Sequence, residues 1–523
     1  MVIVGAGISG LTAGAYLLRS GHEVLILEKT SRCGGLVSSF QKEGFVLDTG
    51  PRAFGNAGIL VPMLEDLRIR LPLVKGLVST GIREEIVHFD GDDAIRGYIE
   101  SLERLFPDSH EDIGRIGKRV RDYRSLARVM NRMPNPFFKN PLKDARYLLR
   151  KFLPWLPSFL GALVKTSLRR RTVEEALDAL TDNPSLKDMV SQHFFKGTPA
   201  GFALGYFENY LDYQYPLGGT GQLPRALEER IVSGGGLIRK EREVVKILPA
   251  ERRLLDQRGE EYSYDRLLWA ADLRSLYRRL DGLSFVPGVL RSIDMQAQEY
   301  LSALPGESAF TLFLGVDEPP EYFGKISRGH FIYTPRSEGL GELHRARLKE
   351  LKGEFPRLSR ERLFQWLRDF CERNSYEISI PALKDRSLAP PGKTGLVISV
   401  LSDGPLFIMA ERAGWLDELR EKVCDYMLDA LENSIYPGLR KKILFMESAT
   451  PITLMRMFNT ADGAITGWSL EKKAPVPNSL TGIMAAVKTA IPHVFKSGQW
   501  SYSPSGVPIA ILTGRIAAAT MGK

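Results

Sequence analysis

The first ten residues contain the feature that most constrains the fold of this chain, a glycine-rich turn between an apolar strand and a helix. Residues 2–4 are Val-Ile-Val, which predicts a buried strand, and residues 5–10 follow as Gly-Ala-Gly-Ile-Ser-Gly. A helical pattern comes next, and a second apolar strand at 24–27 ends at Glu28. This order of strand, turn, helix, strand and acidic residue is typical of a dinucleotide-binding βαβ unit.

Each part of the turn has an expected role in binding a dinucleotide. Gly5 permits the tight turn, Gly7 lets the backbone approach a pyrophosphate, and Gly10 lets the helix pack closely on the strand. The helix begins near Ile8 and Ser9, and its free N–H groups and positive dipole end are expected to bind the phosphates. A glycine-rich turn without a ligand is the alternative, and the surrounding pattern makes it much the weaker one.

Glu28 and the residues after it bear on which dinucleotide binds. The Glu28 carboxylate can accept hydrogen bonds from both hydroxyls of an adenosine ribose, and its charge disfavours the 2′-phosphate of NADP. Arg32-Cys33-Gly34-Gly35 follows directly, and residues 44–51 read Gly-Phe-Val-Leu-Asp-Thr-Gly-Pro. With these two segments the chain resembles the flavin amine oxidase and phytoene desaturase group of FAD enzymes.

This resemblance implies bound FAD rather than NAD. In the group, an arginine and a second glycine pair follow the ribose-binding acid, and the pair contacts the pyrophosphate and ribityl region. Taken singly, the glycine pair could be an ordinary loop and Asp48 a turn cap. The cofactor residues expected in this part of the chain are Lys29, Arg32, Gly34, Gly35 and Leu36.

Later segments are expected to return the chain to the FAD domain. After residues 215–220 we expect a helix over 221–231, then a strand over 237–239 that pairs with a strand over 244–248. The resemblance implies that the backbone near Val245 contacts the adenine, although a buried hairpin strand would fit the same pattern.

Residues 264–272 predict another strand, which ends in small residues. The resemblance implies that Ala271 lets the backbone lie close to the cofactor. Asp272 is expected to cap the helix that follows.

The C-terminus carries a second strong signal. A loop rich in small residues, 498–508, runs into a final helix. The N-terminus of that helix can face the pyrimidine carbonyl of the flavin and stabilise negative charge on the reduced ring. The loop resembles the retinol saturase and carotenoid isomerase branch, and no cysteine near it could hold a covalent flavin. The cofactor residues expected here are Trp500, Gly506, Val507 and Pro508.

The length of 523 residues predicts more than one domain. We expect an α/β fold with a Rossmann-like, glutathione reductase-like FAD domain, an interleaved α+β substrate domain and a helical membrane-facing segment. The FAD domain is assigned to 1–52, 215–280 and 485–523, and the substrate domain to 53–214 and 281–484.

Composition excludes several classes of protein. The three cysteines, Cys33, Cys371 and Cys424, are far apart and show no metal-ligand spacing, so we expect neither a disulfide framework nor a metal site and favour a cytoplasmic location. The net charge of +9 would permit a nucleic-acid partner, but no nucleic-acid-binding motif is present, and none is expected to bind.

Residues 137–171 predict contact with a membrane surface. An apolar and aromatic block, with Trp155 and Phe159 at its centre, lies between two clusters of lysine and arginine. This pattern suits an element that lies on anionic lipid, which predicts a peripheral protein on the inner face of the membrane. A pair of core helices with solvated ends is the alternative.

The leading functional hypothesis is an FAD-dependent oxidoreductase that acts on carbon–carbon bonds of a long apolar isoprenoid or carotenoid-like polyene. It would desaturate, saturate or isomerise its substrate. The alternatives are a flavin amine or porphyrinogen oxidase of the same fold, and a non-catalytic, membrane-associated flavoprotein. No catalytic motif stands out, and the candidates, chosen because their segments are expected near a substrate tunnel, are Tyr210, Tyr213, Arg456 and Trp468.

Overall fold

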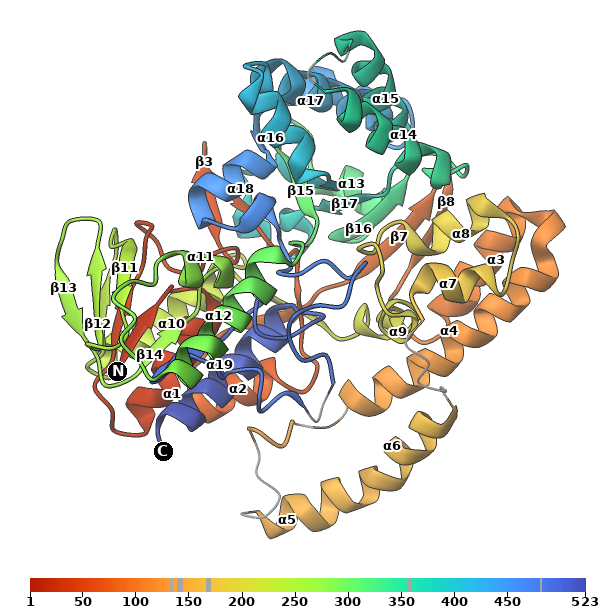
Figure 1. Cartoon of the computed structure of the whole chain (residues 1–523). Coiled ribbons are helices and arrows are strands. Elements are labelled where there is room, and N and C mark those ends of the chain that lie inside the picture. The colour runs from red at the N-terminus through yellow and green to blue at the C-terminus, as the bar shows by residue number, and fades with distance from the viewer. Residues whose placement is uncertain are drawn as a thin grey trace.

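The computed structural model describes the chain in several ranges, which are 1–131, 133, 135–138, 144–165, 171–355, 357, 359–479 and 482–523. A five-stranded parallel sheet forms the centre of the cofactor domain (Figure 1). Its strand order is β10 (Leu237–Arg239), β2 (Leu25–Leu27), β1 (Val2–Val4), β14 (Leu267–Trp269) and β20 (Val494–Lys496).

Helices cover one face of this sheet. Ile3, Ile26 and Leu268 point to that face and share one apolar core with the helices. Strands buried on both faces in this way read as continuous apolar runs, which is why they can be found from the sequence. The helices on this face are α1 (Ile8–Arg19), α2 (Leu60–Leu67), α10 (Gln222–Ser233) and α19 (Val507–Met521).

The opposite face carries a small antiparallel sheet and two helices. Val2, Leu267 and Trp269 point to this side and pack in a separate apolar core. The elements of this layer are β11 (Val244–Leu248), β12 (Arg253–Asp256), β13 (Glu261–Ser263), α11 (Leu273–Arg278) and α12 (Pro287–Ser302).

The predicted hairpin between residues 237–239 and 244–248 is wrong. Strand β10 pairs in parallel with β2, and β11 pairs antiparallel with β12. Two apolar stretches close in sequence predict a hairpin, but here the first completes the edge of the parallel sheet. The expected strands themselves and the helix before them are confirmed.

A seven-stranded sheet forms the centre of the second domain. Its strands are β19 (Ile443–Ala449), β15 (Ser308–Val316), β18 (Thr394–Ser402), β17 (Tyr376–Ser379), β16 (His330–Thr334), β7 (Val78–Ile82) and β8 (Glu85–His88), in that spatial order. One face packs on helices in the largest described apolar core. These helices are α13 (Pro320–Ile326), α14 (Gly341–Glu354), α15 (Arg360–Arg373), α16 (Gly404–Arg412), α17 (Leu416–Glu432) and α18 (Pro451–Phe458).

Short strands and a helical lobe complete the molecule. The strands are β3 (Ser39–Lys42) with β4 (Phe45–Asp48), and β5 (Phe54–Gly55) with β9 (Tyr213–Pro216) and β6 (Leu73–Lys75). The lobe holds α3 (Ala94–Leu105), α4 (His110–Asn131), α5 (Ala145–Tyr147), α6 (Leu153–Lys165), α7 (Val173–Asp178), α8 (Pro184–Ser191) and α9 (Ala200–Asn209). Helices α5 and α6 project at its lower edge (Figure 1).

The cofactor domain recruits more of the chain than the predicted boundaries allow. Helix α2 packs in the core with α1 and α19, and Tyr300 of α12 packs in the core with β14. Both helices fall in the ranges assigned to the substrate domain. Trp468 also joins the second of these cores.

Candidate functional site

The glycine-rich turn has the geometry that a phosphate-binding loop requires. Gly5 has a φ of +101°, and a Cβ at this position would lie 2.8 Å from the carbonyl oxygen of Ala270. A Cβ on Gly10 would overlap the carbonyl oxygen of Gly5, so this glycine sets the close approach of helix and strand. A Cβ on Gly7 would meet nothing within 4 Å. Gly7 therefore faces open space at the start of α1.

The first turn of α1 offers unused donors at this space. Gly7 is the N-cap, no side chain caps the helix, and no acidic residue lies in its first turn. The amides at the start of the helix, including those of Ile8 and Ser9, thus carry the partial positive charge of the helix dipole. An anionic phosphate group fits this position.

The second glycine pair lies against the first motif. Gly34 donates its N–H to the carbonyl oxygen of Ala6 at 2.8 Å, and it forms a parallel bridge with Gly7. Both Gly34 and Gly35 have positive φ, +121° and +58°. The turn that includes Leu36 therefore lines the same open space that Gly7 faces. Arg32 lies beside this turn and is exposed.

Glu28 ends β2 beside the turn and is only 8% exposed. Its Oε2 accepts the N–H of Ala6 at 2.7 Å, and its Oε1 accepts the N–H and the hydroxyl of Thr30, each at 2.9 Å. An ionised carboxylate can accept about four hydrogen bonds. Glu28 can therefore hold the turn in place and still accept a ribose hydroxyl.

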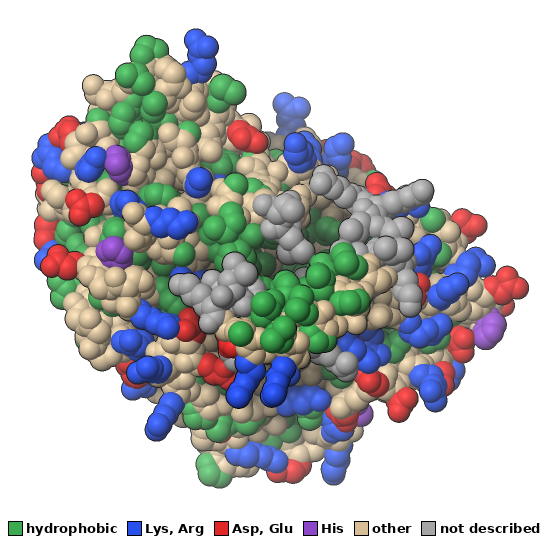
Figure 2. All heavy atoms as spheres, turned by 90° about the horizontal axis from the view of Figure 1, so that it is seen from below, with side chains coloured by type: hydrophobic (Ala, Val, Ile, Leu, Met, Phe, Trp, Pro, Cys, Tyr) green, Lys and Arg blue, Asp and Glu red, His purple; other side chains and the backbone are tan. Residues whose placement is uncertain are grey.

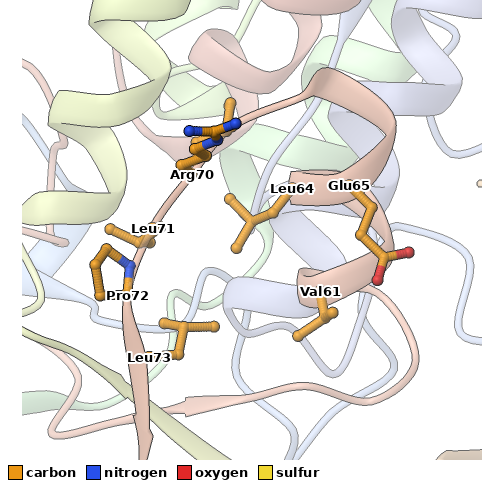
Figure 3. A pocket seen from close by; sticks show the side chains of 8 residues that line it. Val61, Leu64, Glu65, Arg70, Leu71, Pro72 and Leu73 are labelled. Carbon is orange, nitrogen blue, oxygen red and sulfur yellow. The ribbon is translucent and has the colours of Figure 1, made fainter.

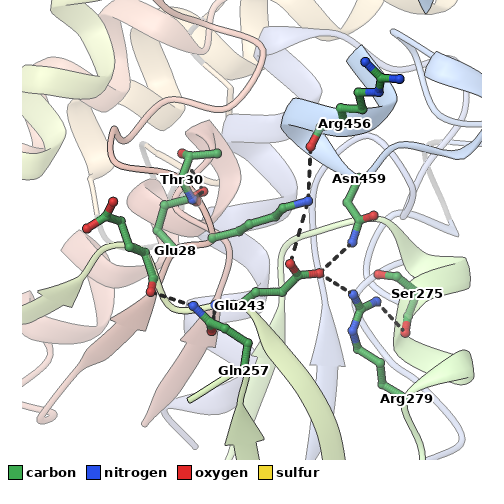
Figure 4. Close-up of polar contacts among 10 residues, drawn as sticks. Glu28, Thr30, Glu243, Gln257, Ser275, Arg279, Arg456 and Asn459 are labelled. Atoms are coloured by element: carbon green, nitrogen blue, oxygen red, sulfur yellow. Dashed lines mark hydrogen bonds and ion pairs between the residues drawn. The ribbon is translucent and has the colours of Figure 1, made fainter. Parts of the chain in front are cut away.

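Lys29 belongs to an ion-pair network at the adenosine end of the site (Figure 4). Its Nζ lies 3.8 Å from Oε2 of Glu243 and donates to the carbonyl oxygen of Arg456 at 3.2 Å. Glu243 also pairs with Arg279 at 2.8 Å and accepts from Asn459 at 3.2 Å. This network connects the end of β2 to the start of β11 and holds the strand that carries Val245 in place.

Val245 is the extra residue of a β-bulge. The pairing register of β11 and β12 shifts between Val244 and Lys246, and the Val245 side chain is 45% exposed. A bulge leaves its extra residue outside the ladder, so an apolar side chain and its backbone are accessible at this edge. A flat apolar ring such as adenine suits that surface.

The C-terminal loop and α19 lie beside α1. A Cβ on Gly514 would overlap the carbonyl oxygen of Ser9, so the two helices cross in close contact. Gly506 is the N-cap of α19, and Val507 and Pro508 form its first turn without a side-chain cap or an acidic residue. The N-termini of α1 and α19 are thus two uncapped helix ends in one region of the cofactor domain.

Buried polar atoms in the loop before α19 also lack partners. The hydroxyl oxygens of Ser497 and Ser501 are buried and have no hydrogen-bond partner among the described residues. Buried polar groups are normally paired, so these two hydroxyls suit a polar ligand. Trp500 is 3% exposed, and its carbonyl oxygen accepts the indole N–H of Trp468 at 3.0 Å. The residues present therefore fit a bound dinucleotide.

Asp48 connects several segments through hydrogen bonds and does not merely cap a turn. It is 1% exposed, and its carboxylate accepts hydrogen bonds from Ser39, Thr220 and Tyr215 at 2.7 to 2.9 Å. Tyr215 begins the segment that returns the chain to the cofactor domain. Asp48 thus joins two stretches that are far apart in sequence. Asp272 is confirmed as the cap of α11, where it accepts the N–H of Ser275.

The four catalytic candidates do not lie together. Tyr210 and Tyr213 are buried in the aromatic core of the helical lobe. Trp468 is 2% exposed in the core of the cofactor domain, next to Trp500. The Arg456 side chain is 71% exposed and pairs with Glu411. Arg456 therefore lies at the surface, apart from the two tyrosines, and its role stays a prediction.

Four ionisable residues that the sequence did not single out lie around Tyr213. Arg52, His330 and Lys384 come together at Glu377, the one acidic residue of the four, whose side chain is exposed. Arg52 is 3% exposed and His330 is 3% exposed. We call these four residues the ionisable cluster. A lone arginine after Gly50-Pro51 was the one signal in the sequence that could have pointed to it.

A separate apolar pocket of about 400 Å³ lies between α2 and β6 (Figure 3). No residue of the glycine-rich turn lines it. Its lining residues are Val61, Leu64, Glu65, Ile69, Arg70, Leu71, Pro72 and Leu73. Within the described ranges, no group of three or more His, Cys, Asp or Glu side chains could hold a metal ion.

Comparison with known proteins places this architecture in a family. The model of the flavin-containing amine oxidoreductase family matches residues 8–521. The chain therefore belongs to this family, and it is an FAD-dependent oxidoreductase.

Three curated relatives match nearly the whole chain at low identity. The inactive all-trans-retinol 13,14-reductase of Danio rerio is 22% identical over 100% of this chain and 85% of its own length. The chloroplastic prolycopene isomerase 1 of an Oncidium hybrid cultivar is 24% identical over 98% of this chain and 82% of its own. The phytoene dehydrogenase of Streptomyces griseus is 24% identical over 99% and 94%.

Solved structures share the fold. An oxidoreductase from Methanosarcina mazei superposes with a TM-score of 0.59 at 15% identity, and the match covers 100% of this chain and 99% of the other. Cyclohexylamine oxidase from Brevibacterium oxydans gives a TM-score of 0.58 at 14% identity, with 100% and 98% covered.

Proposed function

We propose that this FAD enzyme desaturates, saturates or isomerises carbon–carbon bonds of a long apolar polyene. The observation that carries the proposal is the nearly full-length likeness to the named prolycopene isomerase and phytoene dehydrogenase. The C-terminal loop, in which the sequence resembles the same branch, is part of this likeness.

The chain's own residues would bind and orient the cofactor, which supplies the hydride chemistry once bound. The amides at the start of α1 would hold the pyrophosphate, and Glu28 would accept a ribose hydroxyl. The N-terminus of α19 would stabilise negative charge at the flavin end, because its first-turn amides are not capped by a side chain. Tyr210 and Tyr213 stay candidates for the substrate side.

Peripheral membrane contact through α5 and α6 is the second part of the proposal. Leu149, Leu153 and Leu160 are 63%, 47% and 53% exposed. Arg150 and Lys151 are exposed between them. Figure 2 shows hydrophobic side chains gathered on this lower face with basic side chains beside them. Exposed leucines next to cations suit the surface of an anionic membrane.

Part of the predicted membrane segment lies outside the residues that the structure describes. Lys139, Lys143, Arg169 and Arg170 are outside the described residues. The remaining part is held by Trp155, whose indole N–H donates to the carbonyl oxygen of Val129 in α4 at 2.8 Å. Among the described residues, no helix has both the length and the apolar character needed to cross a membrane.

The apolar pocket beside α2 would give the substrate a way in from this face. Phe137 and Phe138, which precede the α5–α6 segment, pack in the same apolar core as the pocket residues Ile69 and Leu71. An apolar entrance next to a lipid surface would let a water-insoluble polyene pass without crossing water.

Anaerobic incubation of the FAD-loaded protein with polyenes of graded saturation tests the reaction. We expect at least one polyene to bleach the oxidised flavin band, or to restore the band of the reduced protein, because electrons must pass between substrate and flavin. A change in double-bond geometry catalysed by the reduced protein would also support the proposal. A flavin that responds to amines but to none of the polyenes would contradict it.

A non-catalytic role is the second candidate, because a relative that matches 100% of this chain is named as inactive. A flavin that stays inert toward polyenes and amines while the protein binds polyenes tightly would favour that role.

A further inference from the structure

The seven-stranded sheet has one apolar face and one face with many polar side chains. Side chains alternate between the two faces of a strand. Tyr376 and Ile378 of β17 point to the helices in the largest core, so Glu377 between them points the other way. Phe331 and Tyr333 of β16 likewise point to the helices. The polar face carries Thr80, Thr311, His330, Glu377, Ser379 and Ser399.

Arg52, Lys384 and Tyr213 pack against the polar face. An amino group of Arg52 donates to the hydroxyl of Ser399, and Nζ of Lys384 donates to the hydroxyl of Ser379 at 2.7 Å and the carbonyl oxygen of Arg52 at 2.8 Å. The ring of Tyr213 stacks on that of His330, with centroids 5.5 Å apart and planes 3° from parallel.

Glu377 is the accessible member of the ionisable cluster. Its side chain is 47% exposed, although its strand lies in the middle of the sheet. It therefore faces solvent-accessible space on the polar face of the sheet. Burial alone would raise the Glu377 pKa, but the His330 contact and the charges of Arg52 and Lys384 outweigh it and lower the pKa to about 2. Glu377 is ionised at neutral pH and can only accept hydrogen bonds.

Three buried nitrogens beside Glu377 have no hydrogen-bond partner among the described residues. Two of them are Nδ1 and Nε2 of His330, although Nε2 lies within ion-pair distance of Glu377, 3.0 Å from its Oε1. Nε of Arg52 also lacks one and lies 4.0 Å from Oε2 of Glu377. Burial lowers the pKa of His330, so the ring is neutral at pH 7 and carries one N–H donor and one acceptor.

The cluster lies close to the expected flavin end of the cofactor. Arg52 donates to the carbonyl oxygen of Gly50 at 2.6 Å, and Gly50 packs so tightly on Leu36 that a Cβ would overlap the Leu36 carbonyl oxygen. Leu36 continues the second glycine turn, which the resemblance assigns to the ribityl region. Strand β5, two residues after Arg52, contacts α19. The cluster thus sits where the substrate-binding sheet meets the cofactor domain.

A plain hydrocarbon would bind poorly against the ionisable cluster. Alkyl groups offer no hydrogen bonds, and an ionised carboxylate stripped of water by an apolar chain loses its solvation without compensation. A substrate carboxylate would be repelled by Glu377. A hydroxyl group fits, because it can donate to Glu377 and accept from an N–H of His330 or Arg52.

We propose that Glu377 and His330, with Arg52 and Lys384 behind them, bind a hydroxyl group carried by an otherwise apolar polyene substrate. This inference rests on the proposed function, and it assigns the substrate class as a polyene alcohol rather than a hydrocarbon. The hydroxyl anchors the substrate at one end of its binding site, so that the same carbon–carbon bond is presented to the flavin in each binding event. Glu377 and His330 are positioning residues in this role.

The test compares three ligands of equal chain length on the FAD-loaded protein at pH 7. The ligands are a polyene with a terminal hydroxyl, the matching hydrocarbon and the matching carboxylate, and the readout is the dissociation constant from the ligand absorption band. We expect the alcohol to bind about tenfold or more tightly than either of the others, because only the alcohol pairs with the buried groups. This comparison needs no variant.

Two substitutions, Glu377→Gln and Glu377→Leu, then test whether Glu377 causes the preference for the alcohol. The amide of Glu377→Gln keeps one acceptor, so the preference should shrink. Glu377→Leu should remove it or favour the hydrocarbon. Glu447→Gln is the matched control, because Glu447 lies in the same sheet with a 49% exposed side chain and pairs with Lys42 at the edge strand β19. FAD content and the melting temperature check that each variant is folded.

Two results overturn the proposal in distinguishable ways. Equal affinity of the wild-type protein for alcohol and hydrocarbon removes the hydroxyl site and leaves the polyene function standing. Failure to bind any of the three ligands, with the flavin inert to them, removes the proposed function and this inference together. An alcohol preference that Glu447→Gln abolishes and Glu377→Leu leaves intact would also contradict the assignment of residues.

Discussion

Gly7 and Gly10 lie three residues apart in the same turn, but a methyl group at the two positions meets different surroundings. At Gly7 it would enter open space, and at Gly10 it would overlap the carbonyl oxygen of Gly5. The first position therefore serves the ligand and the second serves the fold. Both are glycines of one motif, and only the structure separates their roles.

We predict that Gly7→Ala leaves the apoprotein intact and weakens FAD binding. Its free energy of unfolding should stay within about 0.5 kcal/mol of the wild type, because nothing is displaced. FAD affinity, measured by quenching of flavin fluorescence, should fall about tenfold or more because the methyl group takes the place of the pyrophosphate. Gly10→Ala is the contrast: overpacking should lower apoprotein stability by about 1–3 kcal/mol. Equal effects of the two substitutions would contradict these roles.

Lys384 makes the free energy of unfolding depend on pH. Burial lowers the pKa of its ammonium group from 10.5 to about 7. Between these values the unfolded chain holds a proton that the folded chain has released. The free energy of unfolding therefore rises with pH across this window, and the penalty for burying the charge is fully present below pH 7.

We predict that Lys384→Met flattens this dependence. The melting temperature of the wild type relative to the variant should increase as the pH rises from about 7 to 10.5. Thermal unfolding at several pH values measures this difference, and Lys325→Met on the exposed side of α13 is the control. A difference that stays constant over the window would show that Lys384 keeps its ordinary pKa.

At the scale of single elements, α6 combines a packed side with an exposed one. Trp155 anchors it to α4, and Phe159 stacks on Trp155 with ring centroids 4.6 Å apart. Leu153 and Leu160 are exposed. A helix of a water-soluble surface would normally place polar residues there, so the exposed leucines carry the membrane prediction.

We predict that the triple change Leu149→Gln, Leu153→Gln and Leu160→Gln reduces binding to anionic vesicles about tenfold or more, because each leucine loses its favourable transfer into lipid. Co-sedimentation with vesicles rich in phosphatidylserine measures the binding. The pair Val232→Gln and Leu237→Gln, at equally exposed positions of the cofactor domain, is the control. Wild-type protein that does not bind such vesicles even at low salt would contradict the prediction.

Some elements could be read from the sequence and others could not. Strand β1 and helices α1 and α19 follow continuous or periodic apolar patterns, and all three are confirmed. Strand β20 has only three residues and ends in Lys496, whose residue type favours an exposed loop. In the structure Lys496 is buried and donates to the hydroxyl of Tyr300 at 2.6 Å. That partner lies in α12, far away in sequence.

At the scale of the whole molecule, the cofactor site joins three distant parts of the chain. The first 50 residues carry the two glycine turns and Glu28, and the C-terminal helix carries the second uncapped N-terminus. The middle of the chain carries Val245 and Ala271, which we propose for the same site. The substrate sheet is inserted between these parts. Such interleaving brings the ionisable cluster to the boundary between the domains, where cofactor and substrate must meet.

The sequence by itself determined the phosphate-binding turn of the cofactor domain. A phosphate-binding turn depends on local backbone geometry, and Gly5, Gly7, Gly10 and the strand and helix around them encode that geometry within ten residues. Family membership, FAD and the α/β architecture follow from such local patterns.

Only the tertiary structure brought together the residues that we propose for substrate binding. Arg52, His330, Glu377 and Lys384 lie on four separate segments, and each alone reads as an ordinary polar residue. Their mutual contacts arise from the pairing of β16 and β17 and the packing of this sheet against the cofactor domain. Electrostatic contacts of this kind depend on distance in space, which a single sequence does not record.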